Sequence, residues 1–144
     1  MRSNVRKLVL VLFILSLTGC MSVAEFDQSA YDQAVSLKTE SITLMNKANE
    51  SFLLHKVESD SLKARVEAAC IYSAGRLNNS ETTAQWEIMK DPGRSQLFGF
   101  LERWEKNDHL NPVFIAEVDL LVADAFDTIL SLELDKKYLN GGMR

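Results

Sequence analysis

A long stretch without helix breakers constrains the fold more than any other feature of the sequence. Residues 23–74 contain neither glycine nor proline, and most of them favour helices. One continuous helix over this stretch would be about 75 Å long, too long for a compact domain of this size. Asn49-Glu50-Ser51 combines a C-cap amide with an N-cap hydroxyl, so we predict two helices divided at these residues.

The first of these helices carries a repeat of apolar and small residues. Ala30, Leu37 and Leu44 recur every seven residues, which predicts the contact seam of a helical bundle. Further members of the seam are Phe26, Ala34, Ser41 and Ala48, and we expect Val35, Ile42 and Met45 to widen it.

The second helix should end at Gly75. Its predicted core residues are Leu54, Leu62, Val66, Ala69 and either Ile71 or Tyr72.

Residues 82–107 predict two short helices. Thr82 or Thr83 can cap the first, and the turn Asp91-Pro92-Gly93 ends it. The second has apolar residues at helical spacing, namely Leu97, Phe100, Leu101 and Trp104.

The last helix has the strongest start signal of the chain, Asn111 at the N-cap followed by Pro112. Its predicted apolar face is Phe114, Val118, Leu121, Ala125, Ile129 and Leu132. The sequence therefore predicts an all-α domain over residues 25–139, an antiparallel bundle of three long helices plus short helices between residues 82 and 107. Residues 140–144 should form a disordered tail.

Aromatic residues gather in the short helices. Both tryptophans, Trp86 and Trp104, lie there with Phe98 and Phe100, and Arg103 is beside them. Such a cluster is typical of a surface that recognises a partner, and equally of a lid packed over the end of a bundle. Both interpretations stay open at this point.

The N-terminal segment has the three parts of an export signal. Arg2, Arg6 and Lys7 precede an apolar run from Leu8 to Leu17, in which only Ser16 is polar. This run would make a helix of about 15 Å, half the hydrocarbon thickness of a bilayer, so it is too short for a comfortable span. It indicates a signal peptide. An ordinary cleaved secretory signal and an uncleaved anchor are the alternatives.

The end of this run, Leu17-Thr18-Gly19-Cys20, resembles the lipobox of bacterial lipoproteins. The resemblance implies cleavage between Gly19 and Cys20, a diacylglyceryl group on the Cys20 thiol and an acyl chain on its new amine. Residues 1–19 would then be a cleaved signal and residues 20–24 a lipidated tether. Met21 stands where enterobacterial lipoproteins retained in the inner membrane have Asp, so the outer membrane is favoured over the inner one. The domain after the tether resembles no family.

Charge and cysteine content narrow the partners of the mature chain. Losing Arg2, Arg6 and Lys7 leaves 13 basic against 20 acidic side chains, a formal charge of −7. An acidic domain gains nothing electrostatically from nucleic acid, which we discount. With Cys20 lipidated, Cys70 is the only free thiol, so packing must hold the fold. Its apolar surroundings predict a buried, inert thiol, with a reactive thiol as the alternative.

The sequence offers no recognisable catalytic or metal-binding motif. His55 and His109 are far apart, and a pairing of His109 with Glu105 is explained by surface chemistry. No nucleophile with a base, phosphate loop or dinucleotide fingerprint is present. We therefore expect no enzyme, and no cofactor beyond the lipid on Cys20.

These patterns lead to one expected function and one alternative. We expect a periplasmic lipoprotein whose non-catalytic helical domain binds a protein or cell-envelope partner at the membrane. The alternative is a small-ligand module with a pocket at the aromatic cluster.

The lipobox generates a direct prediction for the protein isolated from cells. Its mass should correspond to a chain that begins at Cys20 and carries a diacylglyceryl group and an amide-linked acyl chain. Intact-mass measurement checks this. An uncleaved leader, or a trimmed chain without fatty acids, would contradict the anchor.

Overall fold

The computed structural model describes residues 23–141, and most of this range is helical. The helices are α2 (Gln28–Met45), α3 (Phe52–Ala74), α4 (Ser80–Lys90), α5 (Leu97–Asn107) and α6 (Pro112–Gly141). Within residues 23–141 there is no strand, so the predicted all-α bundle is confirmed. The predicted signal at 1–19, most of the predicted tether and residues 142–144 lie outside the described residues.

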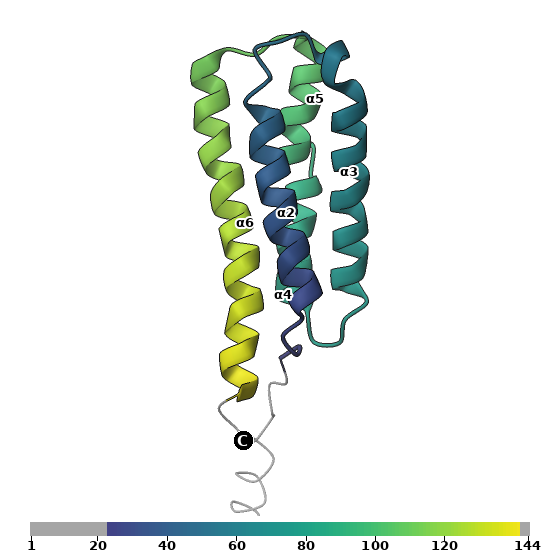
Figure 1. Ribbon diagram of the computed structural model, residues 1–144, viewed down its shortest axis with the longest axis vertical. Coiled ribbons are helices and arrows are strands. Elements are labelled where there is room, and N and C mark those ends of the chain that lie inside the picture. The colour runs from purple at the N-terminus through teal and green to yellow at the C-terminus, as the bar shows by residue number, and fades with distance from the viewer. Residues whose placement is uncertain (1–22, 142–144) are drawn as a thin grey trace, which may run out of the picture.

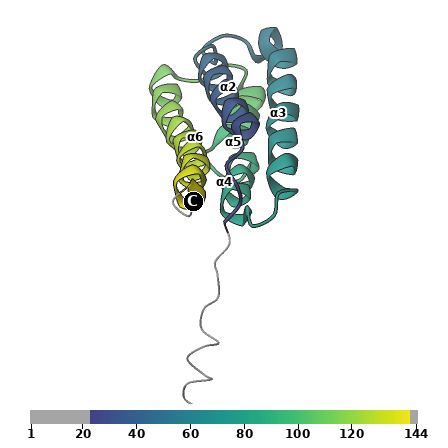
Figure 2. The same ribbon diagram turned by 60° about the horizontal axis from the view of Figure 1, so that its bottom comes forward.

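The bundle has four arms, because α4 and α5 follow one another along its length (Figure 1). The predicted short helices therefore form an integral arm rather than an insert. Figure 2, in which the bottom of the molecule is turned toward the viewer, shows α2 between α3 and α6, and α4 packs against both α3 and α6. Neighbouring arms run in opposite directions. We call the end where α2 begins and α6 ends the base; it includes loop 75–79. The opposite end, with loops 46–51 and 108–111, is the top.

Most of the predicted seam of α2 is buried, with Phe26 and Ala30 only partly so, and the predicted face of α3 is correct in part. In α2, Leu37 and Leu44 are in the core and Met45 joins them, whereas Val35 is exposed and does not widen the contact. In α3, Leu62, Val66 and Ala69 are buried as predicted, whereas Leu54 and both alternatives at the end of the helix, Ile71 and Tyr72, are exposed. The buried side of α3 consists of Phe52, Ser59, Leu62, Val66, Ala69, Cys70 and Ser73. This helix is apolar on two opposite sides, so periodicity alone did not fix which side faces inward.

The break in the fourth arm has local causes. The Asp91 carboxylate accepts a hydrogen bond from the Gly93 amide at 2.9 Å, and Pro92 between them cannot continue α4. In α5, Gly99 lies so close to the carbonyl of Arg94 that a Cβ would overlap it. The turn can therefore fold back tightly enough for α5 to continue along the bundle.

Helix α6 forms the longest wall of the core. Asn111 caps it as predicted, its side-chain oxygen accepting from the Val113 amide at 2.8 Å. The helix continues to Gly141, slightly beyond the predicted boundary at 139. The predicted face is also slightly rotated, since Leu121 is exposed. The buried stripe is Ile115, Val118, Val122, Phe126, Ile129, Glu133 and Lys136.

At the top, the cap of α3 is Asp108, which lies 56 residues after Phe52 in the sequence. Ser51 precedes α3 as predicted, but its hydroxyl makes no capping bond to its own helix and donates to the Asp108 carboxylate at 2.7 Å. The same carboxylate and the Asp108 carbonyl both accept from the Phe52 amide at 3.0 Å. Leu110 donates its amide to the Ala48 carbonyl at 2.7 Å. These bonds join the two top loops.

We predict that Asp108→Ala lowers the free energy of unfolding by about 1–2 kcal/mol, the usual cost of losing a helix cap. The loss has a second source, because Asp108 has a φ of 62°, a region that alanine adopts less readily than Asp or Asn. Asp108→Asn keeps an acceptor and tolerates this φ, so it should lose much less. Urea unfolding of the wild type and both variants measures these differences. An Asp108→Ala variant as stable as the wild type would contradict the capping role.

Candidate functional site

The aromatic residues considered as candidates for partner binding lie inside the bundle. Trp86, Phe98, Phe100 and Trp104 are all buried. The Trp104 indole donates to the carbonyls of Glu50 and Asp108, both at 3.0 Å, and its ring meets Phe52 edge-on at 5.4 Å. Core packing, one of the two interpretations left open, describes these side chains.

The surroundings of the cluster fit this conclusion. Trp86 meets Phe126 edge-on at 5.9 Å between centroids. The hollow beside Trp86 has a volume of about 10 Å³, room for about one water molecule rather than a ligand. Arg103 alone is exposed, and its guanidinium lies 4.2 Å above the ring of Phe114. A partner could therefore reach Arg103, but not the buried rings.

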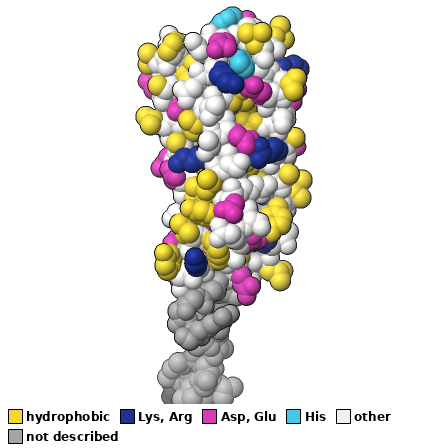
Figure 3. Space-filling model, in the orientation of Figure 1, with side chains coloured by type: hydrophobic (Ala, Val, Ile, Leu, Met, Phe, Trp, Pro, Cys, Tyr) yellow, Lys and Arg dark blue, Asp and Glu magenta, His cyan; other side chains and the backbone are white. Residues whose placement is uncertain are grey.

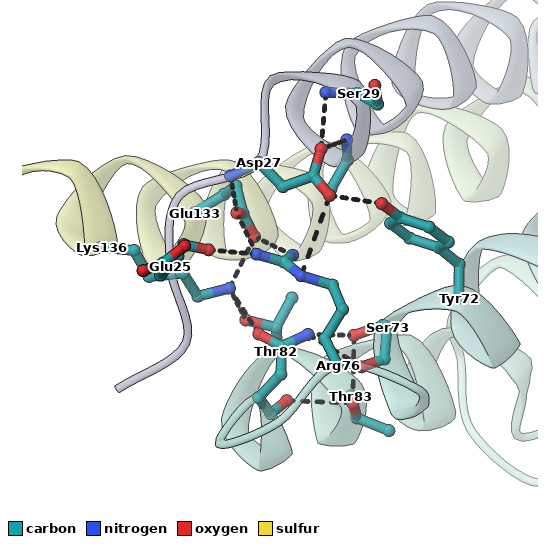
Figure 4. A network of polar contacts seen from close by, with 12 residues as sticks. Glu25, Asp27, Ser29, Tyr72, Ser73, Arg76, Thr82, Thr83, Glu133 and Lys136 are labelled. Carbon is teal, nitrogen blue, oxygen red and sulfur yellow. Dashed lines mark hydrogen bonds and ion pairs between the residues drawn. The ribbon is translucent and has the colours of Figure 1, made fainter. Parts of the chain in front are cut away.

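The most unusual polar arrangement is a buried ionic cluster at the base (Figure 4). Its centre is Glu133 on α6, whose side chain is 2% exposed. Arg76, just after α3, donates to both carboxylate oxygens of Glu133, at 2.8 and 2.9 Å. The Asp27 amide at the start of α2 donates at 2.8 Å, and Lys136 donates at 2.6 Å. Four donors from three segments of the chain thus converge on one carboxylate.

Lys136 connects this cluster to α4. Its ammonium donates to Glu133, to the side-chain oxygen of Asn79 at 2.5 Å and to the Thr82 hydroxyl at 3.0 Å. These bonds use all three donors of the ammonium group. Asn79 in turn donates to the carbonyl and hydroxyl of Ser73 on α3, at 3.0 and 2.8 Å. All four arms are therefore tied into one network, the fourth through α4.

The pKa shifts agree with a cluster that stays ionised. Burial alone would raise the pKa of Glu133, but hydrogen bonds from Arg76, Lys136 and the Asp27 amide outweigh it and hold that pKa below its ordinary value of 4.5. Burial lowers the pKa of Lys136, and the bond to Glu133 partly offsets this effect. The hydrogen bond to Glu133 raises the pKa of Arg76.

A second carboxylate completes the base. Tyr72 donates its hydroxyl to Asp27, and this bond, aided by the amides of Ala30 and Ser29, lowers the pKa of Asp27. The amide bonds cap α2, at 2.8 Å from Ser29 and 3.1 Å from Ala30. Arg76 lies 4.0 Å away from the same carboxylate. The acceptors and donors in this network satisfy one another, so its evident role is to fasten the arms together.

Sequence reasoning missed this cluster, although one signal was present. Glu133 and Lys136 follow Ile129 at four and seven residues, the spacing of the buried stripe of α6. A glutamate and a lysine in the apolar phase of a helix indicate a buried pair. Nothing in the local sequence pointed to Arg76 as their partner.

The histidines and possible metal ligands can now be placed. His55 lies 2.8 Å from the Glu50 carboxylate and stacks obliquely on Trp104 at 5.5 Å. His109 lies 3.0 Å from the Asp108 carboxylate, so its closest acidic partner is not the predicted Glu105. Among residues 23–141, no group of three or more histidine, cysteine or acidic side chains is arranged to hold a metal ion.

Comparison with known proteins provides no relative for this chain. No family model matches it, and no curated protein or solved structure shows significant similarity to it. In the described part of the chain, no helix has the length and apolar character needed to cross a bilayer.

Cys70 has the environment of an unreactive thiol. It is buried on α3 and donates to the Glu87 carboxylate at 3.0 Å. Burial, with the nearby carboxylate, raises the pKa of Cys70 to about 11. Since only the thiolate is a strong nucleophile, little reactive form is present at neutral pH.

We predict that Glu133→Gln lowers the free energy of unfolding at neutral pH by about 3–5 kcal/mol, because the buried Lys136 and the partly buried Arg76 lose their anion. The folded-state pKa of Glu133 is depressed. Its stabilisation is therefore present above the unfolded pKa and is lost as the pH falls through the folded one. The gap between wild type and variant should narrow in acid. Urea unfolding across a pH series checks this.

Asp135→Asn serves as the control for that series, since Asp135 is an exposed carboxylate on the same helix. It should change stability little at any pH. A gap for Glu133→Gln that is independent of pH would contradict an ionised Glu133 in the folded protein.

We predict that Cys70 does not react with a maleimide in the native protein and reacts fully once urea unfolds it. Its raised pKa and burial both act in this direction. Ala68→Cys, at an exposed position on the same helix, should react readily and serves as the matched control. Mass measurement after timed labelling distinguishes them, and equal rates at the two positions would contradict the prediction.

Proposed function

We propose that this chain is a bacterial lipoprotein whose helical domain binds a protein partner of the cell envelope and catalyses no reaction. Lipids on Cys20 would hold the domain at the periplasmic face of the outer membrane. The sequence Leu17-Thr18-Gly19-Cys20, after a basic start and a short apolar run, supports the anchor. Two or more acyl chains hold a protein on a bilayer firmly, whereas one does so only reversibly.

The observation that supports a partner is the outward side of α3. Leu53, Val57, Ala64, Ala68 and Ile71 follow one another at steps of three, four or seven residues, so they lie on one side of the helix. All five are exposed, and Leu54 and Tyr72 extend the surface along one edge. We call this surface the α3 stripe. Figure 3 shows apolar side chains along the edge of the molecule that α3 forms.

This surface differs from a normal solvated helix face. A surface helix usually carries polar residues opposite its buried stripe, whereas α3 carries leucine, valine and isoleucine there. Contiguous exposed apolar patches are typical of binding surfaces. Charged pairs border the stripe, such as Lys56 with Asp60 at 2.7 Å. An apolar centre with a polar rim is the usual anatomy of a protein interface.

The chemistry of the stripe favours a protein over a small ligand. It extends over 19 residues of helix from Leu53 to Ile71, about 27 Å at 1.5 Å per residue. A convex, elongated surface of this kind fits the groove or helix of another protein. The alternative of a ligand pocket at the aromatic cluster has no support, because those rings fill the core.

We predict that Leu53→Glu weakens partner binding about tenfold or more, because a carboxylate replaces an apolar side chain in the contact. The measurement is the yield of crosslinked adduct formed by the lipidated protein in its native membrane. Leu120→Glu is the matched control, since Leu120 on α6 is 73% exposed and Leu53 is 77% exposed. It should leave the yield unchanged.

Circular dichroism should show that both variants fold. If Leu53→Glu and Leu120→Glu reduce the yield of crosslinked adduct equally, or if neither reduces it, the α3 stripe is not the binding surface. Recovery of the protein without fatty acids would contradict the anchor independently of the partner.

A further inference from the structure

The base carries apolar side chains that no arm of the bundle covers. Leu77 in the loop after α3 is 86% exposed, and Tyr138 and Leu139 near the end of α6 are also exposed. Val23, the first described residue, lines one hollow with Leu139 and a second hollow with Leu77. Three separate segments therefore bring apolar side chains to the same end of the molecule. We call Val23, Leu77, Tyr138 and Leu139 the basal patch.

The loop that carries Leu77 is held firmly in this position. The Asn78 carbonyl accepts from the Ala24 amide at 3.1 Å, and Asn79 is bonded to Ser73 and Lys136. Arg76, on the other side of Leu77, is fixed by its two bonds to Glu133. Both neighbours of Leu77 thus belong to the bonded structure of the base. The outward position of Leu77 is therefore built into the fold.

The chain before the bundle is short. Ala24 is buried, and its amide bond to Asn78 attaches it to the base. Only four residue steps separate Ala24 from Cys20, so even a fully extended chain spans about 14 Å. The headgroup region of one leaflet is itself about 6 Å thick. If Cys20 carries lipid, the base cannot leave the immediate neighbourhood of the membrane.

We propose that the basal patch rests in the interfacial layer of the same bilayer that holds the Cys20 lipids. This inference rests on the proposed anchor. Leu77 and Leu139 contact the acyl boundary, and Tyr138 lies at headgroup level, where tyrosine is enriched in membrane proteins. The bundle then stands with α6, about 45 Å long, directed away from the membrane.

The contact is apolar rather than electrostatic. Exposed charged residues around the basal patch are Glu25, Glu81, Asp135 and Lys137, so acidic groups are in excess there. Anionic lipid would therefore not attract the base, and its docking should be insensitive to salt. This distinguishes it from a polybasic surface that binds acidic lipid headgroups. A standing bundle also leaves the whole α3 stripe open to a protein partner.

The test places environment-sensitive probes on single cysteines of the lipidated protein. Leu77→Cys and Leu139→Cys report on the base, and Leu53→Cys reports on the top. Leu120→Cys is the matched control on α6 itself, in the third of that helix nearest the top. Cys70 is buried and the Cys20 thiol would be lipidated, so neither competes for the label. The protein is reconstituted in phosphatidylcholine vesicles, with and without brominated acyl chains.

The expected result is a blue-shifted emission at positions 77 and 139, most of which brominated lipid quenches. Emission from positions 53 and 120 should not change. If the protein is lipidated but the probe at position 77 has the same emission as the probe at position 120, the basal contact is overturned and the anchor is left intact. Quenching at 53 as well would mean that the bundle lies along its α3 side, and would also overturn it. Mass measurement that finds no fatty acids would overturn the anchor, and this inference with it.

Discussion

The carboxylate of Glu133 is the point through which the base of the bundle is held together. A buried anion is costly unless it is fully hydrogen-bonded, and here four donors meet it. Those donors come from the start of α2, the end of α3 and α6 itself, while Lys136 adds α4. The arrangement of the arms at the base therefore follows from the need to satisfy one charge. An apolar residue at 133 would pack in the core, but it would not require hydrogen-bond donors from particular positions on the other arms.

The loops at the top are held together by different contacts from those at the base. There the contacts are mostly those of the main chain, from Leu110 to Ala48 and from Phe52 to Asp108, with the Trp104 indole between them. Helix α3 is thus fixed at both ends, by main-chain contacts and the Asp108 carboxylate at the top and by side-chain bonds at the base. A rod held in this way presents the α3 stripe as a preformed surface. Preformed surfaces lose less entropy on binding than mobile ones.

Much of the fold was predictable because its determinants are local. The break near residues 49–51, the start at Asn111-Pro112 and the seam of α2 depend on a few neighbouring residues each, and all were found in the expected places. The inward side of α3 was predicted only in part: Leu62, Val66 and Ala69 are buried, but Leu54 is exposed, because the helix also carries apolar residues on its outward side. The ionic cluster depends on Arg76 and Glu133, 57 residues apart in sequence, and only the folded chain brings them together. The lipobox on Cys20 stays a prediction, because it lies outside the described residues.

The two apolar sides of α3 also have a consequence for how the chain reaches its native state. Rotating this helix by half a turn about its axis would exchange Leu53, Val57 and Ile71 for Leu62, Val66 and Ala69. Apolar character alone therefore does not select the native orientation of α3. The native orientation of α3 also forms polar contacts with α4, such as those of Ser73 with Thr83 and of Cys70 with Glu87. A chain that collapsed on the wrong side of α3 would bury Leu53, Val57 and Ile71, which are exposed in the folded protein. Polar contacts of α3, including those of Arg76 with Glu133 at its end, therefore add to apolar burial in selecting which side of this helix faces inward.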